Sequence, residues 1–145
     1  DDGTALREGP AIVQYLADLS PASGLAPAAG TFERYRLVEW LNFISTELHK
    51  GFSPLFNPSM PEEAKTIAKE RLKSRFAWLE KEVEGKEYLM GEHFSVADGY
   101  LFTVLNWATP TGVDLAPYPH LLAWHARVGA RPAVQAAQKT QSQSA

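Results

Sequence analysis

Apolar side chains recur at the three- and four-residue spacing of amphipathic helices throughout the chain after Gly30. Thr31 can cap a first long helix, which we expect to end or bend at Pro54. A second long helix begins near Pro61 and runs to Gly85. This stretch shows neither strand alternation nor an internal repeat. The sequence therefore predicts an all-α bundle.

The second half of the chain adds shorter helices to this bundle. Ser95–Asp98 has the form of a capping box, in which each end side chain can reach the other's backbone N–H. The helix that it opens is nearly all apolar, as expected of a central helix. After a turn we expect two short helices, at 121–128 and 132–138. The polar tail, residues 139–145, is expected to be mobile.

The first thirty residues have a different character. Residues 1–7 offer a few strand-like positions without a partner strand, and residues 8–18 then form a short helix. The next stretch consists mainly of Ala, Gly, Ser and Pro and reads as a connector. We therefore divide the chain into residues 1–22, a linker at 23–30, and a helical domain at 31–145.

Composition excludes several classes of function. At 145 residues, with 45% hydrophobic content and a net charge of -3, the chain suits a globular domain without the basic clusters that bind nucleic acid or anionic membranes. It has no apolar run of about 18 residues and no apolar signal segment, which favours the cytoplasm. Cysteine is absent, and His93, His120 and His125 form no metal-ligand spacing, so we expect no metal site.

Polar residues gather on one otherwise apolar helix, in the segment 42–52. At about 100° per residue, Asn42, Thr46, His49 and Lys50 fall on one face, while Glu47 points roughly 140° away from Asn42. One face could line a ligand site and the other could reach a neighbouring chain. The alternative is structural, because His49 and Lys50 also suit the negative end of a helix dipole. Asn42 and Glu47 could likewise be surface groups.

Four segments carry a resemblance to a known family: Glu8–Ile12, Asn42–Phe52, Ser95–Asp98 and Arg131–Val134. Together they resemble a glutathione transferase, most closely the bacterial beta class, over nearly the whole chain. The resemblance implies a subunit with a thioredoxin-like first part and an all-helical second part. Residues 1–22 would then be the last strand and helix of the first part, with most of that domain missing. It also implies a homodimer, formed through the two long helices.

The resemblance implies a role for each of several residues in binding glutathione, the co-substrate. Glu8 is expected to bind the γ-glutamyl amino group, and the backbone N–H of Gly9 the γ-glutamyl carboxylate. Asn42 and Glu47 match positions that contact the same end of the tripeptide, with reach across the dimer interface. Lys50 is expected to complement the charge of the tripeptide.

The resemblance further implies that His49 is the catalytic residue, which stabilises the glutathione thiolate or an oriented water. Phe52 and Phe56, with Trp107 as a weaker candidate, would border the hydrophobic electrophile. Asp98 is assigned to capping and not to catalysis. The family's cysteine and cis-proline loop are not among these 145 residues, which predicts weak binding of glutathione.

The implied function is conjugation or reduction of electrophilic small molecules with glutathione, a detoxification activity. The alternative is a non-catalytic helical module of the same type that docks other proteins. Glutathione binding, and its loss on mutation of His49 or Glu8, discriminates between the two.

Overall fold

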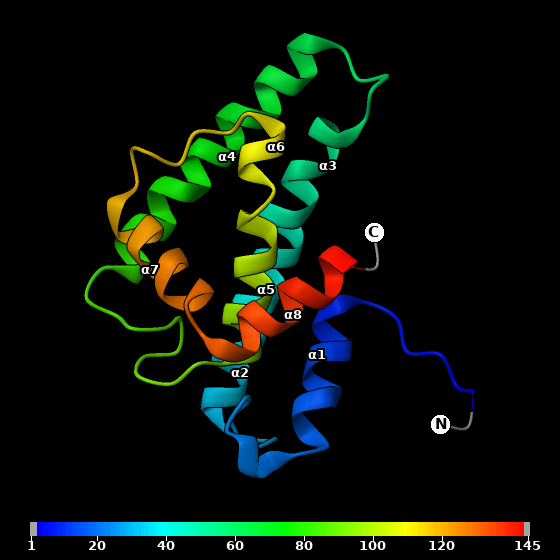
Figure 1. The fold of residues 1–145 in the computed structure, drawn as a ribbon, viewed down its shortest axis with the longest axis vertical. Coiled ribbons are helices and arrows are strands. Elements are labelled where there is room, and N and C mark those ends of the chain that lie inside the picture. Colours follow the sequence, from blue (N-terminus) through cyan, green and yellow to red (C-terminus); the bar gives the residue numbers. More distant parts are fainter. Residues whose placement is uncertain (1–2, 144–145) are drawn as a thin grey trace.

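The computed structural model describes residues 3–143, and these fold as a bundle of helices (Figure 1). The helices are α1 Gly9–Asp18, α2 Phe32–Phe43, α3 Lys50–Phe56, α4 Glu62–Val83, α5 Val96–Leu105, α6 Ala108–Thr111, α7 Pro119–Gly129 and α8 Pro132–Gln143, with a 3₁₀ turn η1 at Pro21–Ser23 and a π-helix η2 at Ile44–His49. Within the described residues, no helix is long and apolar enough to cross a membrane.

The predicted all-α bundle is confirmed, but the strand expected at the start is not formed. Residues 3–7 have no strand structure, and the single β-bridge in the described part of the chain joins Tyr88 to Gly91. A strand needs a neighbour to satisfy its backbone groups, and residues 3–7 have none here. Residues 1–2, which belong to the same predicted strand, lie outside the described residues.

Helix α5 lies in the middle of the bundle, as its apolar sequence predicted (Figure 1). Leu101 and Val104 are completely buried in the core. The predicted capping box is present: Asp98 accepts hydrogen bonds from the backbone N–H and the hydroxyl of Ser95, at 2.9 and 3.0 Å. Its other oxygen accepts from the Leu89 N–H and the Trp124 indole. Burial raises the pKa of Asp98, while these hydrogen bonds act in the opposite direction.

The first long helix differs from its prediction in two ways. Its middle, η2, is a π-helix, and the chain continues through Pro54 to the end of α3 at Phe56. The residue after α3, Asn57, has an extended backbone, which is the conformation favoured before a proline, here Pro58. Gly51 has a packing role, because a Cβ atom there lies 3.0 Å from Leu72 of α4. The glycine lets α3 approach α4 closely.

The two C-terminal helices are both longer than predicted. Helix α7 begins at Pro119 because Glu80 of α4 accepts hydrogen bonds from the next two backbone N–H groups, those of His120 and Leu121. Helix α8 continues to Gln143, so residues 139–143 are helical and not the mobile tail that we expected. Val134 is the residue of α8 that packs against the core.

Candidate functional site

The candidate site begins at the N-terminus of α1, where Glu8 has a strained backbone. Its φ of 69° is the only positive φ of a non-glycine residue in residues 3–143. Its carbonyl oxygen accepts hydrogen bonds from Ala11 and Ile12, which starts the helix. As the first helical residue, Gly9 has an N–H without an acceptor inside the helix. Strain of this kind costs about 1–3 kcal/mol and often marks functional sites.

His49, the last residue of η2, meets α5 at the side of the bundle. Its Nδ1 lies 2.8 Å from the hydroxyl oxygen of Tyr100. The imidazole also contacts the indole of Trp107 edge-on, with the ring centroids 4.8 Å apart. Despite these contacts His49 remains exposed to solvent. Its imidazole is therefore available to a ligand.

Tyr100 brings the two parts of the site together. A Cβ atom placed on Gly9 lies 3.8 Å from the Tyr100 hydroxyl, the same hydroxyl that contacts His49. The start of α1 and the imidazole of η2 therefore both lie against the hydroxyl end of one phenol. Sequence analysis did not select Tyr100. The available signal was a phenol hydroxyl in a helix that is largely apolar.

An aromatic wall continues from His49 toward the end of α3. Phe56 contacts Trp107 edge-on at 5.5 Å between centroids and is 51% exposed. Phe52 contacts the same indole at 5.9 Å from the buried side. The sequence had named all three aromatic residues as candidates for such a wall. An apolar surface next to an exposed imidazole can hold a hydrophobic molecule beside a polar reacting group.

Glu47 and Lys50 lie together on another side of the same helix. Both line a groove of about 190 Å³ between η2, α3 and α4, with Arg71 and Arg75. The Glu47 carboxylate is ion-paired there with the Nε of Arg75 at 2.6 Å. Lys50 is exposed. We refer to this feature as the charged groove.

The charged groove corrects the predicted arrangement of the polar helix. We expected Thr46, His49 and Lys50 on one face and Glu47 on another, but Thr46 and Lys50 line the groove with Glu47, and His49 does not. The cause is the π-helix, whose wider turns advance by roughly 80° per residue instead of about 100°. His49 is thereby turned roughly 120° from Thr46, where a regular helix gives about 60°.

The remaining predictions concern Asn42 and metals. Asn42 is exposed on α2, and its side chain makes none of the hydrogen bonds found within residues 3–143. The structure does not bring it into contact with His49 or Tyr100. No group of three His, Cys, Asp or Glu side chains that could hold a metal occurs in the described part of the chain.

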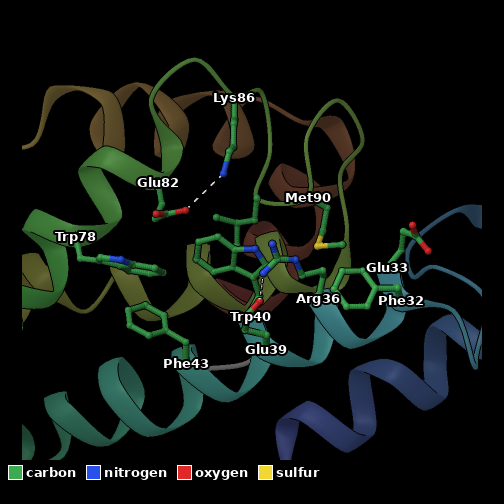
Figure 2. A pocket seen from close by; sticks show the side chains of 11 residues that line it. Phe32, Glu33, Arg36, Glu39, Trp40, Phe43, Trp78, Glu82, Lys86 and Met90 are labelled. Carbon is green, nitrogen blue, oxygen red and sulfur yellow. Dashed lines mark hydrogen bonds and ion pairs between the residues drawn. The ribbon is translucent and has the colours of Figure 1, made fainter.

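A second concave surface lies between α2 and α4, and we call it the aromatic groove. Figure 2 shows Trp40, Phe43 and Trp78 gathered between α2 and α4, with Phe43 and Trp78 4.6 Å apart between centroids. The groove has a volume of about 730 Å³ and ends in charged side chains, including the Lys86–Glu82 ion pair. Its apolar centre and charged rim resemble a protein–protein interface.

Comparison with known proteins gives one consistent result. Residues 43–132 match the family described as glutathione S-transferase, C-terminal domain. The chain is 44% identical over 135 residues to glutathione S-transferase GstA of Escherichia coli O157:H7, which covers 93% of this chain and 67% of that protein.

Two solved structures show the same similarity at the level of the fold. The bacterial glutathione S-transferase BphK, solved as a ternary complex, superposes with a TM-score of 0.96 at 52% identity, over 98% of this chain and 71% of that one. A sphingomonad glutathione S-transferase complexed with glutathione gives a TM-score of 0.93 at 48% identity, with the same coverage.

Proposed function

The chain belongs to the glutathione S-transferase family, and we propose that it uses glutathione as co-substrate to conjugate or reduce hydrophobic electrophiles. One observation carries this proposal: Gly9, at the start of α1, and the exposed imidazole of His49 both lie against the hydroxyl of Tyr100, beside an aromatic wall. A related structure was solved in complex with glutathione. Nothing in the site or the comparisons favours a non-catalytic docking module.

The N-terminus of α1 is the proposed binding site for the γ-glutamyl end of glutathione. A carboxylate suits a helix N-terminus, because the unpaired N–H and the helix dipole both favour negative charge. The Gly9 N–H is the donor there, and the exposed Glu8 carboxylate can accept from the amino group of the same γ-glutamyl unit. The strained backbone at Glu8 fixes the start of this helix. Exposed Asn42 is proposed as a further contact of the γ-glutamyl end.

His49 is the proposed catalytic residue. Glutathione reacts through its thiolate, so a group that stabilises the sulfur anion increases the reactive fraction. The sulfur then attacks the electrophilic carbon, and for a chlorinated nitroaromatic the C–S bond replaces the C–Cl bond as chloride leaves. The aromatic wall of Phe56 and Trp107 next to His49 is the proposed position of the electrophile.

The charged groove is proposed to act on the glutathione bound by a second subunit. Glu47 and Lys50 line the charged groove, and His49 does not, which supports a contact of these two residues with a different glutathione molecule. A cross-subunit contact gives both residues a tripeptide to bind. The ammonium group of that tripeptide must share the Glu47 carboxylate with Arg75.

We further propose that the chain forms a homodimer through the aromatic groove. Trp78 is 42% exposed and Phe32 is 71% exposed, and both line this groove on the two helices expected at the interface. Burying large aromatic side chains is a major source of binding energy in such contacts. The proposed compartment is the cytoplasm, where the glutathione pool keeps thiols reduced.

Calorimetry with glutathione tests the function directly. We expect saturable binding by the unmodified chain, weakened by Glu8→Ala, and conjugation of a chlorinated nitroaromatic that His49→Ala lowers. His93→Ala is the matched control, because His93 is exposed and lies outside the site. Absence of binding at millimolar glutathione contradicts the proposed function of this chain.

A further inference from the structure

We propose that Tyr100 is a positioning residue that fixes the tautomer of His49, so that His49 donates a hydrogen bond from Nε2 to the glutathione sulfur. The observation is the 2.8 Å separation between the Tyr100 hydroxyl oxygen and His49 Nδ1. The link to glutathione rests on the proposed function. The tautomer itself is a property of the protein without ligand.

The chemistry of the two groups sets the direction of their hydrogen bond. Neutral imidazole has one N–H donor and one nitrogen acceptor, whereas a phenol can donate or accept. Phenol is much more acidic than neutral imidazole, and the imidazole nitrogen is the stronger base. The favoured arrangement is therefore Tyr100 O–H donating to His49 Nδ1. This leaves the imidazole proton on Nε2.

The surroundings hold the imidazole in one orientation. The indole of Trp107 meets the imidazole at an interplanar angle of 82°, and the ring of Tyr100 does so at 74°. Nε2 makes none of the hydrogen bonds found within residues 3–143, and His49 is exposed. The Nε2–H group is therefore free to donate to a ligand.

This assignment decides whether His49 acts on glutathione as a hydrogen-bond donor or as a general base. With its proton on Nε2, the neutral imidazole offers a donor to the substrate side and has no free nitrogen there to act as a base. A donor stabilises a thiolate, and hydrogen bonds to charged groups are the stronger ones. Tyr100 also lies against Gly9, so the same phenol sets the imidazole relative to the start of α1.

The first test measures the tautomer in the full chain without glutathione. Long-range ¹H–¹⁵N spectra are recorded at a pH of about 8.5, where an ordinary imidazole is neutral. Loss of one signal set in His49→Gln assigns the resonances among the four histidines. We expect a pyrrole-type Nε2 and a pyridine-type Nδ1. In Tyr100→Phe the two ¹⁵N shifts should move part of the way toward each other, as the tautomer preference is weakened.

The matched control is Tyr35→Phe, which removes a hydroxyl from a side chain that is 66% exposed on α2. It should leave the His49 shifts unchanged. A proton on Nδ1 in the unmodified protein overturns the proposal. So does a Tyr100→Phe spectrum in which the His49 tautomer is unchanged, because the phenol then does not set it.

The second test follows ionisation of the bound glutathione thiol through the ultraviolet absorbance of its thiolate. In Tyr100→Phe we expect the pH of half-ionisation to rise by about one unit, which is tenfold less thiolate at low pH. An unchanged midpoint overturns the role in thiolate stabilisation. Absence of glutathione binding contradicts the proposed function and leaves the tautomer result standing, so the two failures are distinguishable.

Discussion

The guanidinium group of Arg34, in α2, binds both carboxylate oxygens of Asp18, the last residue of α1. The Arg34 side chain is 10% exposed, and its Nε also donates to the Pro27 carbonyl at 2.7 Å. One side chain therefore ties the end of α1 and the loop after it to the bundle. Because Gly9 starts the same helix, this contact also positions the proposed glutathione site.

Acid should loosen α1. The hydrogen bond from Arg34 lowers the pKa of Asp18, so the folded-state pKa lies below the unfolded value of about 3.9. The stabilisation is present above the unfolded pKa and is lost as pH falls through the folded pKa. We expect hydrogen-exchange protection factors in α1 to fall between about pH 5 and pH 2. Asp18→Asn should show low protection already at neutral pH, and an equal acid response in this variant contradicts the assignment.

Replacing Glu8 separates its backbone strain from its carboxylate. Glu8→Gly removes both, because glycine adopts a φ of 69° without penalty, and we expect a gain of about 1 kcal/mol in unfolding free energy. Glu8→Ala removes the carboxylate and keeps the strain, so it should give no gain. Urea denaturation measures both variants. Equal stability of the two variants means that the backbone at residue 8 is not strained.

Gly51→Ala should destabilise the contact between α3 and α4. The added methyl group lies 3.0 Å from the Cδ2 atom of Leu72, so this fully buried side chain has to shift against the core. We expect a loss of about 1–3 kcal/mol, as in other overpacked cores. Gly99→Ala is the matched control. Its methyl group meets Phe94 at an ordinary 3.7 Å, so the better helix propensity of alanine should stabilise the protein by about 0.5–1 kcal/mol.

Asp98→Asn should be strongly destabilising although it changes only one atom. Asp98 is completely buried and accepts four hydrogen bonds, two at each oxygen. An asparagine amide turns one acceptor into a donor that faces other donors, which costs about 3 kcal/mol. Exposed Asp114, which accepts from the Ala116 N–H, provides the control. Similar denaturation midpoints for Asp98→Asn and Asp114→Asn are the contrary result.

Trp78→Glu should abolish the proposed homodimer. The substitution places a charge in the aromatic groove and removes the Trp78 ring, whose centroid lies 4.6 Å from that of Phe43. Sedimentation velocity should show a dimer for the unmodified chain and a monomer for the variant. Leu122→Glu, at a side chain of α7 that is 39% exposed, should remain dimeric. A monomeric unmodified chain, or a dimeric Trp78→Glu variant, excludes an interface at this groove.

Local signals predicted most of the fold. The capping box at Ser95–Asp98 formed as expected because it depends only on residues close in sequence. The start of α7 could not be read locally, because the Glu80 that caps it comes from another helix. The helix also continues for two residues beyond Pro54, where the sequence predicted an end or a bend. The packing of α3 on α4 outweighs the local preference of one proline.

The residues of the candidate site were selected from the sequence, but their arrangement was not. His49 and Gly9 were selected from the sequence, and the structure places both next to Tyr100. Tyr100 itself was missed because its contacts span 51 residues of sequence to His49. The sequence pattern assumes regular helical turns, so it could not show that His49 is turned away from Thr46 and Lys50. Only tertiary structure reveals an irregular turn.

The π-helix at Ile44–His49 is a less favourable conformation than a regular α-helix, but it cannot be removed without changing the arrangement of the candidate site. A π-helical turn, with hydrogen bonds between residues five apart, contains one more residue than an α-helical turn. Deleting one residue there would therefore restore a regular α-helix. The shortened helix would be better formed, yet everything beyond the cut would swing by about 100°. A protein that keeps His49 in contact with Tyr100 must therefore also keep the π-helix.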